Sequence, residues 1–412
     1  MILRFGRIQW KVPERQACIN WFIVGLILLP IYIKFMSILS QILSFSTTFT
    51  TYLYYGVLWL LLLSGIKGIL RQATSAVIVA VVSAAIIVFE MLVHPTSIEY
   101  IFGGDLFSFV TFQPSALIPS ALFIFIGLAI SDFENLGMLL HKGARIGVIG
   151  ATLTYAMMLV RGIAIHYDDM STAYGICLAV CVLVAYQERK DWMFITLGII
   201  CLVLAGTRGP ILCLIAALMF KFIIFEENLR KKIWGVVLCV FAALIIYSGL
   251  GFQLLVIFEK LLSGFGITSL RFLDYLNEGM FFDGSGREGL ANILIEAIQK
   301  HPILGYGIGG DRLLLPKGFY AHNLVIEALV SFGVIGGGAF LIWVAFLSLG
   351  VLTSPRADIR KMGIGLFCGI VMKLFLSSSF IISREFFLFL GFCMAVRRVS
   401  KRRAKIESEE NK

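Results

Sequence analysis

The sequence predicts an all-α, polytopic integral membrane protein with about twelve transmembrane helices. Of its 412 residues, 59% are hydrophobic and only 15% are charged, and the mean hydropathy is +0.92. A soluble domain carries about 25% charged residues. Apolar stretches of roughly 18–22 residues recur along the chain, and each is long enough to cross a bilayer about 30 Å thick as a helix. These observations exclude an ordinary soluble globular protein.

The apolar stretches place the spans along the whole chain. We expect them near residues 19–40, 51–66, 73–93, 112–131, 145–165, 171–187, 191–206, 209–225, 233–252, 323–350, 362–381 and 384–396. The first span contains Pro30, and the last is short. Basic residues from Arg4 to Arg15 precede the first span without a small-residue cleavage site, so this span is expected to act as its own insertion signal.

The distribution of basic residues predicts the orientation. Most of the 35 Lys and Arg residues fall in loops on one side of the predicted spans. Because basic loops stay in the cytoplasm, both termini are expected inside. The net charge of +10 then reflects topology and attraction to the membrane surface, and it requires no nucleic-acid partner. The 8 Cys lie in spans or in the N-terminal tail, so we expect no disulfides.

The spans divide the chain into four parts. They are an N-terminal transmembrane bundle (1–252), a large, partly helical outer loop (253–322), C-terminal transmembrane helices (323–396) and a basic cytoplasmic tail (397–412). In the outer loop, Ser285 is a candidate cap for an amphipathic helix that ends at His301-Pro302. The glycine run "GYGIGG" follows, and by itself it is a weak signal for phosphate binding.

Two arginines that are predicted to lie on the outer side occupy positions where a basic residue is unusual. Arg208, in "AGTRGP", lies between two spans where the positive-inside rule disfavours it. Arg287 opens the amphipathic helix, where a basic residue opposes the helix dipole. A phosphate would explain both positions, since a guanidinium and a helix N-terminus can hold the same anion. The alternatives are an arginine that snorkels to lipid headgroups for Arg208 and an exposed loop arginine for Arg287.

His322 and Asn323 lie at the outer mouth of the tenth span. The alternative for His322 is an ordinary interfacial residue. The five His are scattered, and neither a metal-ligand spacing nor a GxSxG nucleophile motif is present. We therefore expect no metal and no cofactor.

Three motifs resemble the O-antigen ligase and O-antigen polymerase superfamily: "AGTRGP", "SGREGL…HPILGYGIGG" and "AHNLVIEALVSFGVIGG", in that order. His322-Asn323, nine residues and "GVIG" from Gly333 resemble the ligase signature. This chain has Gly337-Gly338 where that signature has two threonines, and this departure favours the polymerase branch. The segment "RGIAIHYDDMSTAYG" makes Arg161 a secondary candidate.

The resemblance implies an inverting, metal-independent glycosyltransferase on the periplasmic face of the bacterial inner membrane. It would polymerise undecaprenyl-pyrophosphate-linked oligosaccharide units into O-antigen or a related polysaccharide, with membrane lipids and a chain-length regulator protein as further partners. Arg208 and Arg287 would bind the pyrophosphate and His322 would be the general base. Asn323 and Glu327, on one helical face, would support the site.

Other interpretations stay open. A ligase would transfer the glycan to lipid A-core instead, a flippase would move lipid-linked sugars, and a structural membrane partner would do neither. Transporters usually place ionisable groups at mid-membrane. Here Lys34, Lys373 and Glu327 are the main charges within spans, and the unusual charges gather on one face. This asymmetry favours surface chemistry.

Overall fold

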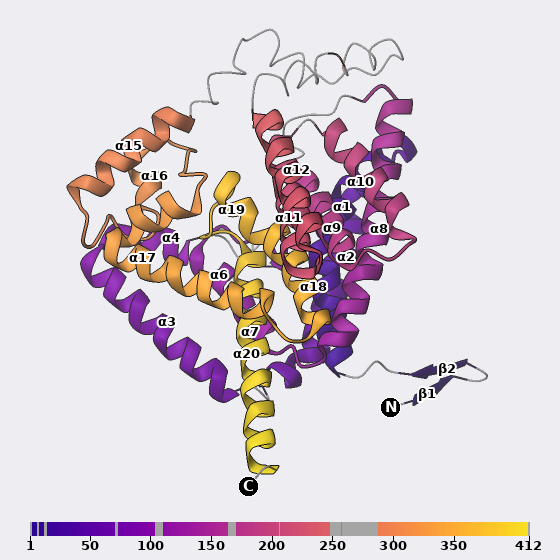
Figure 1. The fold of residues 1–412 in the computed structure, drawn as a ribbon, viewed down its shortest axis with the longest axis horizontal. Coiled ribbons are helices and arrows are strands. Elements are labelled where there is room, and N and C mark those ends of the chain that lie inside the picture. The colour runs from indigo at the N-terminus through magenta and orange to yellow at the C-terminus, as the bar shows by residue number, and fades with distance from the viewer. Residues whose placement is uncertain are drawn as a thin grey trace.

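The computed structural model describes residues 2–5, 8–11, 15–70, 73–103, 110–163, 170–205, 207–247, 257 and 287–410. A small antiparallel hairpin, β1 (Ile2–Phe5) and β2 (Ile8–Lys11), precedes the helices. The N and C ends of the chain lie towards the same edge of the molecule, and α15 lies towards the opposite edge (Figure 1). Which face of the membrane each end occupies stays a prediction.

The described residues are otherwise mostly helical. The first half contains α1 (Arg15–Leu43), α2 (Thr47–Leu70), α3 (Ala73–Val93), the 3-10 turn η1 (Pro95–Ser97), α4 (Ile98–Phe102), α6 (Leu117–Ala121), α7 (Phe123–Leu128), α8 (Phe133–Val160) and α9 (Met170–Tyr186). The second half contains α10 (Asp191–Leu204), α11 (Arg208–Phe225), α12 (Leu229–Tyr247), α15 (Arg287–Lys300), α16 (Gly310–Leu314), α17 (Leu324–Leu352), α18 (Ala357–Leu366), the π-helical turn η3 (Phe367–Val371), α19 (Met372–Leu376) and α20 (Arg384–Glu410).

Six helices in the described part of the chain are long and apolar enough to cross a membrane. They are α1, α2, α3, α8, α11 and α17. The protein is therefore a multi-pass membrane protein, whereas the full set of twelve spans stays a prediction. Helix α9 lies at the centre of the bundle, packed against α1, α8, α10, α11 and α18, and residues 172–185 are all buried. This position explains its sequence, since a helix that is apolar all round is normally buried.

Two predicted spans take a different form in the structure. The stretch 112–131 contains two short helices, α6 and α7, instead of one span. The Arg398 guanidinium donates to the carbonyl oxygens of Leu128 and Ile130, at 3.0 and 3.5 Å, just past the end of α7. The stretch 362–381 is divided among α18, η3 and α19. Proposed boundaries also move: α8 begins at Phe133 rather than 145, and α20 continues through the predicted tail to Glu410.

Helix α17 is broken near its N-terminal end by Gly333, which has φ 69° and ψ −178°. This backbone conformation is essentially restricted to glycine. At the break, the Val334 N–H donates to the Pro302 carbonyl oxygen at 2.6 Å instead of to the preceding turn of the helix. A Cβ on Gly333 would lie 2.2 Å from the Ile303 carbonyl oxygen. The break therefore lets the segment after α15 pack directly on the α17 backbone.

The glycine run fits into this break. The Tyr306 N–H donates to the Val330 carbonyl oxygen at 2.8 Å, and the Gly307 N–H donates to that of Ser331 at 2.9 Å. Within the run, the Gly310 N–H donates to the Gly307 carbonyl oxygen at 2.9 Å. These three amide groups are used inside the protein. The run "GYGIGG" thus fastens the segment after α15 to α17, and these three amides are not available to a phosphate.

Candidate functional site

Asn323 forms the N-cap of α17. Its side-chain oxygen accepts hydrogen bonds from the Val325 and Ile326 N–H groups, at 2.9 and 3.2 Å. A side-chain cap of this kind satisfies N–H groups that a helix leaves without partners. The Asn323 amide nitrogen also donates to the Phe375 carbonyl oxygen at 3.2 Å, in α19. Asn323 therefore fixes the start of α17 against the end of α19.

His322 immediately precedes this cap and is half-buried. Its φ is +52°, an uncommon backbone conformation for a residue other than glycine and one that is often found at functional sites. The imidazole lies 3.8 Å from the Tyr320 ring, centroid to centroid, at an interplanar angle of 34°. The Tyr320 hydroxyl donates to the Ser377 carbonyl oxygen at 3.2 Å. The imidazole is thus placed by the cap on one side and by an anchored tyrosine on the other.

Glu327 is completely buried one turn into α17. Its carboxylate accepts hydrogen bonds from the Ser379 hydroxyl and from the Phe380 N–H, the latter at 3.0 Å. The link to Asn323 runs through the backbone, where the Glu327 N–H donates to the Asn323 carbonyl oxygen at 2.9 Å. Glu327 therefore joins α17 to the segment between α19 and α20, which is a supporting role.

Arg312, on the short helix α16, is a member of this group that the sequence analysis missed. Its guanidinium donates to Asp311 at 3.0 Å, to the Ser379 hydroxyl at 2.7 Å and to Glu327 at 3.4 Å. It also lies 5.5 Å from the centroid of the Tyr320 ring. Asp311 is completely buried. No local pattern predicts this arrangement, because most of the partners of Arg312 come from distant parts of the chain.

Arg208 is the first residue of α11 and is half-buried. The next residue, Gly209, lies so close to its neighbours that a Cβ there would be 2.2 Å from the Tyr174 hydroxyl and 3.9 Å from the Leu376 Cβ. The start of α11 therefore lies against the end of α19. The same end of α19 contacts the residues on either side of His322. The start of α11, with Arg208, and the loop that contains His322 thus both contact the end of α19.

The structure shows less about the other two predicted arginines, Arg287 and Arg161. Arg287 opens α15, as the sequence predicts, and its side chain lies outside the described part of the structure. Helix α15 packs on α17 through Leu294, which forms a small buried cluster with Leu315 and Val330. Arg161 is the exposed C-cap residue of α8, and no described contact links it to the group around His322.

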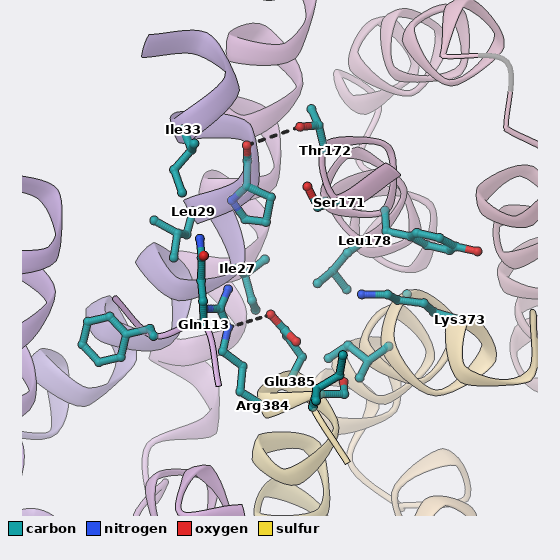
Figure 2. A pocket seen from close by; sticks show the side chains of 18 of the residues that line it. Ile27, Leu29, Ile33, Gln113, Ser171, Thr172, Leu178, Lys373, Arg384 and Glu385 are labelled. Atoms are coloured by element: carbon teal, nitrogen blue, oxygen red, sulfur yellow. Dashed lines mark hydrogen bonds and ion pairs between the residues drawn. The ribbon is translucent and has the colours of Figure 1, made fainter. Parts of the chain in front are cut away.

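A cavity of about 490 Å³ lies among α1, α9, η3–α19 and the start of α20. Lys373, Arg384, Glu385 and Gln113 extend towards its interior from three different segments (Figure 2). Lys34 also lines it. The structure therefore brings together the two lysines that the sequence analysis noted as isolated charges within spans.

A second polar cluster lies where α8 meets the connection between α9 and α10. His141, Glu188 and Asp191 place donor atoms within 4.8 Å of one another, close enough to hold a metal ion. The Arg145 guanidinium, however, already bonds both carboxylates, to Asp191 at 2.8 Å and to Glu188 at 2.5 Å. His141 bonds Asp191 at 2.8 Å. We interpret this cluster as an ion-pair network that joins the helices.

Comparison with known proteins finds one similarity. Residues 192–341 match the family model described as O-antigen ligase. This segment includes Arg208, Arg287, Arg312, His322, Asn323 and Glu327. No curated protein and no solved structure matches the chain. The matched segment contains every residue of the group around His322 that α16 and α17 supply, and it is similar to the O-antigen ligase family.

Proposed function

We propose that this protein is a surface-polysaccharide polymerase of the O-antigen type, a glycosyltransferase that extends undecaprenyl-pyrophosphate-linked oligosaccharide units. The observation that carries the proposal is the placement of His322. This half-buried imidazole, positioned by the Asn323 cap and by Tyr320, borders the end of α19, against which the start of α11 with Arg208 also lies. Both residues belong to the segment that matches the O-antigen ligase family.

In the proposed reaction, a hydroxyl of the acceptor sugar attacks the anomeric carbon of the donor glycan. A new glycosidic C–O bond forms while the C–O bond to the lipid pyrophosphate breaks, and the pyrophosphate leaves with the bonding electrons. His322 accepts the hydroxyl proton as general base. A single displacement of this kind inverts the configuration at the anomeric carbon.

The leaving pyrophosphate needs positive charge in the site. Guanidinium groups suit this role because they stay charged and bind phosphate with two parallel hydrogen bonds. We assign the role to Arg208 and Arg287. Arg312 differs, because its guanidinium already bonds the buried carboxylates of Asp311 and Glu327. Arg312 is therefore a positioning residue.

The proposal includes a location and partners. The site would face the periplasm, with both termini in the cytoplasm of a bacterial cell and the chain in the inner membrane. The donor and the acceptor would both be lipid-linked oligosaccharides, and a chain-length regulator protein would be a further partner. No cofactor is required, because the pyrophosphate linkage supplies the driving force.

A ligase that transfers the glycan to lipid A-core is the second candidate, since the matched family is described as O-antigen ligase. The glycines at the signature position count against it. A Cβ on Gly337 would lie 2.6 Å from the Ala328 carbonyl oxygen, so the helix has no room there for the threonine of the ligase signature. Gly338 has no atoms within 4 Å of the equivalent position. The two glycines in place of the signature threonines support the polymerase proposal.

Deletion of the gene, followed by gel analysis of the surface glycan, tests the function. We expect the ladder of long glycans to disappear while a single repeat unit stays attached. Loss of the single repeat as well would indicate a ligase, and an unchanged ladder would refute both candidates. Complementation with His322→Ala should fail. His301→Ala, at an exposed histidine on the adjoining segment, is the matched control and should restore the ladder.

A further inference from the structure

The cavity between α9 and α20 contains an arginine that is not fully satisfied by the protein. Arg384 is only 6% exposed, and its Nε donates to Glu385 at 2.8 Å. Its Nη1 is buried and has no hydrogen-bond partner among the described residues. An unsatisfied buried donor costs free energy, and more so when the group is charged. Arg384 therefore keeps a guanidinium charge at the cavity wall, with Glu385 as its paired carboxylate.

The charges around Arg384 also favour an anion. Lys34 and Lys373 line the same cavity, and Glu385 is the one acidic residue among the lining residues that the structure describes. Figure 2 shows Lys373 and Arg384 extending into this space from different helices. Three cationic side chains against one carboxylate give the described part of the lining a net positive charge.

The remaining walls combine apolar side chains with the hydroxyl and amide groups of Ser37, Gln113, Ser171, Thr172 and Ser383. Ile27, Leu29, Ile33, Leu178 and Ile370 contribute apolar surface. The volume of about 490 Å³ lies within the roughly 300–1,000 Å³ range of ligand pockets. A cationic group beside apolar walls suits a phosphate that is attached to a hydrocarbon chain. The cavity therefore has the chemistry of a lipid-phosphate site.

This cavity adjoins the Arg208 region but is separate from it. The Lys373 ammonium lies 5.2 Å from the centroid of the Tyr174 ring, while Gly209 packs against the hydroxyl of the same tyrosine. Tyr174 thus lies between Lys373 and the start of α11. Arg208 is not among the residues that line the cavity. Arg208 therefore lies at the start of a helix next to the cavity, without lining it.

We infer that this cavity binds the lipid phosphate of the acceptor, while Arg208 and Arg287 bind the pyrophosphate of the donor. The inference rests on the proposed polymerase function, because a polymerase holds two lipid-linked substrates at once. It also explains why the acceptor phosphate site is apart from His322, since at least one sugar separates the attacking hydroxyl from the lipid phosphate.

Binding of radiolabelled undecaprenyl pyrophosphate to the full-length protein, in nanodiscs of neutral phosphatidylcholine, tests the inference without requiring turnover. The wild-type protein should bind two molecules per chain. The double variant Lys34→Gln/Lys373→Gln should weaken one of the two sites about 10²- to 10⁴-fold, since each of the two cations contributes a charge-assisted contact. Arg208→Ala should weaken the other site. Lys142→Gln, which removes an exposed lysine from α8, is the matched control and should bind as the wild type does.

Competition with other lipids shows which kind of lipid phosphate the cavity binds. Phosphatidylglycerol should displace the labelled lipid poorly; equal displacement would show a general site for anionic lipids and would overturn the inference. Preferential binding of lipid A at the Lys34 and Lys373 site would keep the acceptor role but would refute the polymerase in favour of the ligase. Unchanged binding by the folded double variant would overturn the inference itself. Thermal unfolding of each variant checks its fold, and the single variant Lys34→Gln serves if the double variant unfolds.

Discussion

Replacing Gly333 by alanine should destabilise the protein strongly, because the break in α17 depends on this residue. Its φ of 69° and ψ of −178° lie in a region that costs a side chain about 1–3 kcal/mol. The new Cβ would also lie 2.2 Å from the Ile303 carbonyl oxygen. Relief of this contact requires the segment after α15 to move away from α17.

The movement would break hydrogen bonds that fasten the segment to the helix. Three are at risk: the bond from Val334 to Pro302 and the two from the glycine run to α17. At about 0.5–1.5 kcal/mol each, their loss adds to the backbone strain, so we expect a total destabilisation of about 3 kcal/mol or more. Equilibrium unfolding of the purified protein by denaturant in detergent measures this difference.

Gly338→Ala is the matched control in the same helix. A Cβ at Gly338 meets no atom within 4 Å, and alanine in a helix is favoured over glycine by about 0.5–1 kcal/mol. The control should therefore leave the free energy of unfolding unchanged or raise it. If the two variants had the same stability, the docking of the segment after α15 into α17 would be refuted.

Three further predictions concern the group around His322 and the topology. Arg312→Ala should lower the free energy of unfolding by about 3–5 kcal/mol, since it leaves buried carboxylates without their cation; a stable variant in the same denaturant assay would show that the network is dispensable. Glu327→Ala should reduce polymer formation less than His322→Ala does, at equal protein levels, and equal losses would contradict its supporting role. Reporter fusions after Lys190 should report the cytoplasm and fusions within 260–315 the outside, whereas a cytoplasmic signal from the latter range would reverse the predicted orientation.

The apolar pattern predicts helices well where a helix carries few charges. The predicted span 73–93 has the same bounds as α3. Helix α8 is longer than predicted, because the His141, Lys142 and Arg145 region interrupts its apolar pattern. In the structure, His141 and Arg145 are paired with Asp191 on the neighbouring helix α10, and such a partner is invisible to a pattern read along one segment.

The candidate site was likewise predictable only where its residues lie close together in the sequence. The motif around His322 and Asn323 was identifiable because both residues lie at the start of one apolar helix. Arg312 was not, since its hydrogen-bond partner Ser379 is 67 positions away. Lys34 and Lys373 were visible as isolated charges, but only the fold places them in one cavity.

Elongation of synthetic undecaprenyl-pyrophosphate-linked repeat units by the purified protein tests the proposed chemistry most directly. The assay contains EDTA and no ATP, and it compares the wild type with His322→Ala while donor binding is measured on the same preparations. We predict that the wild type elongates the units and that His322→Ala loses about 10²–10⁴ in rate with nearly unchanged binding, because a general base acts on the acceptor hydroxyl. A wild type that needs a divalent cation or ATP, or a His322→Ala variant that elongates at the normal rate, would contradict the proposal.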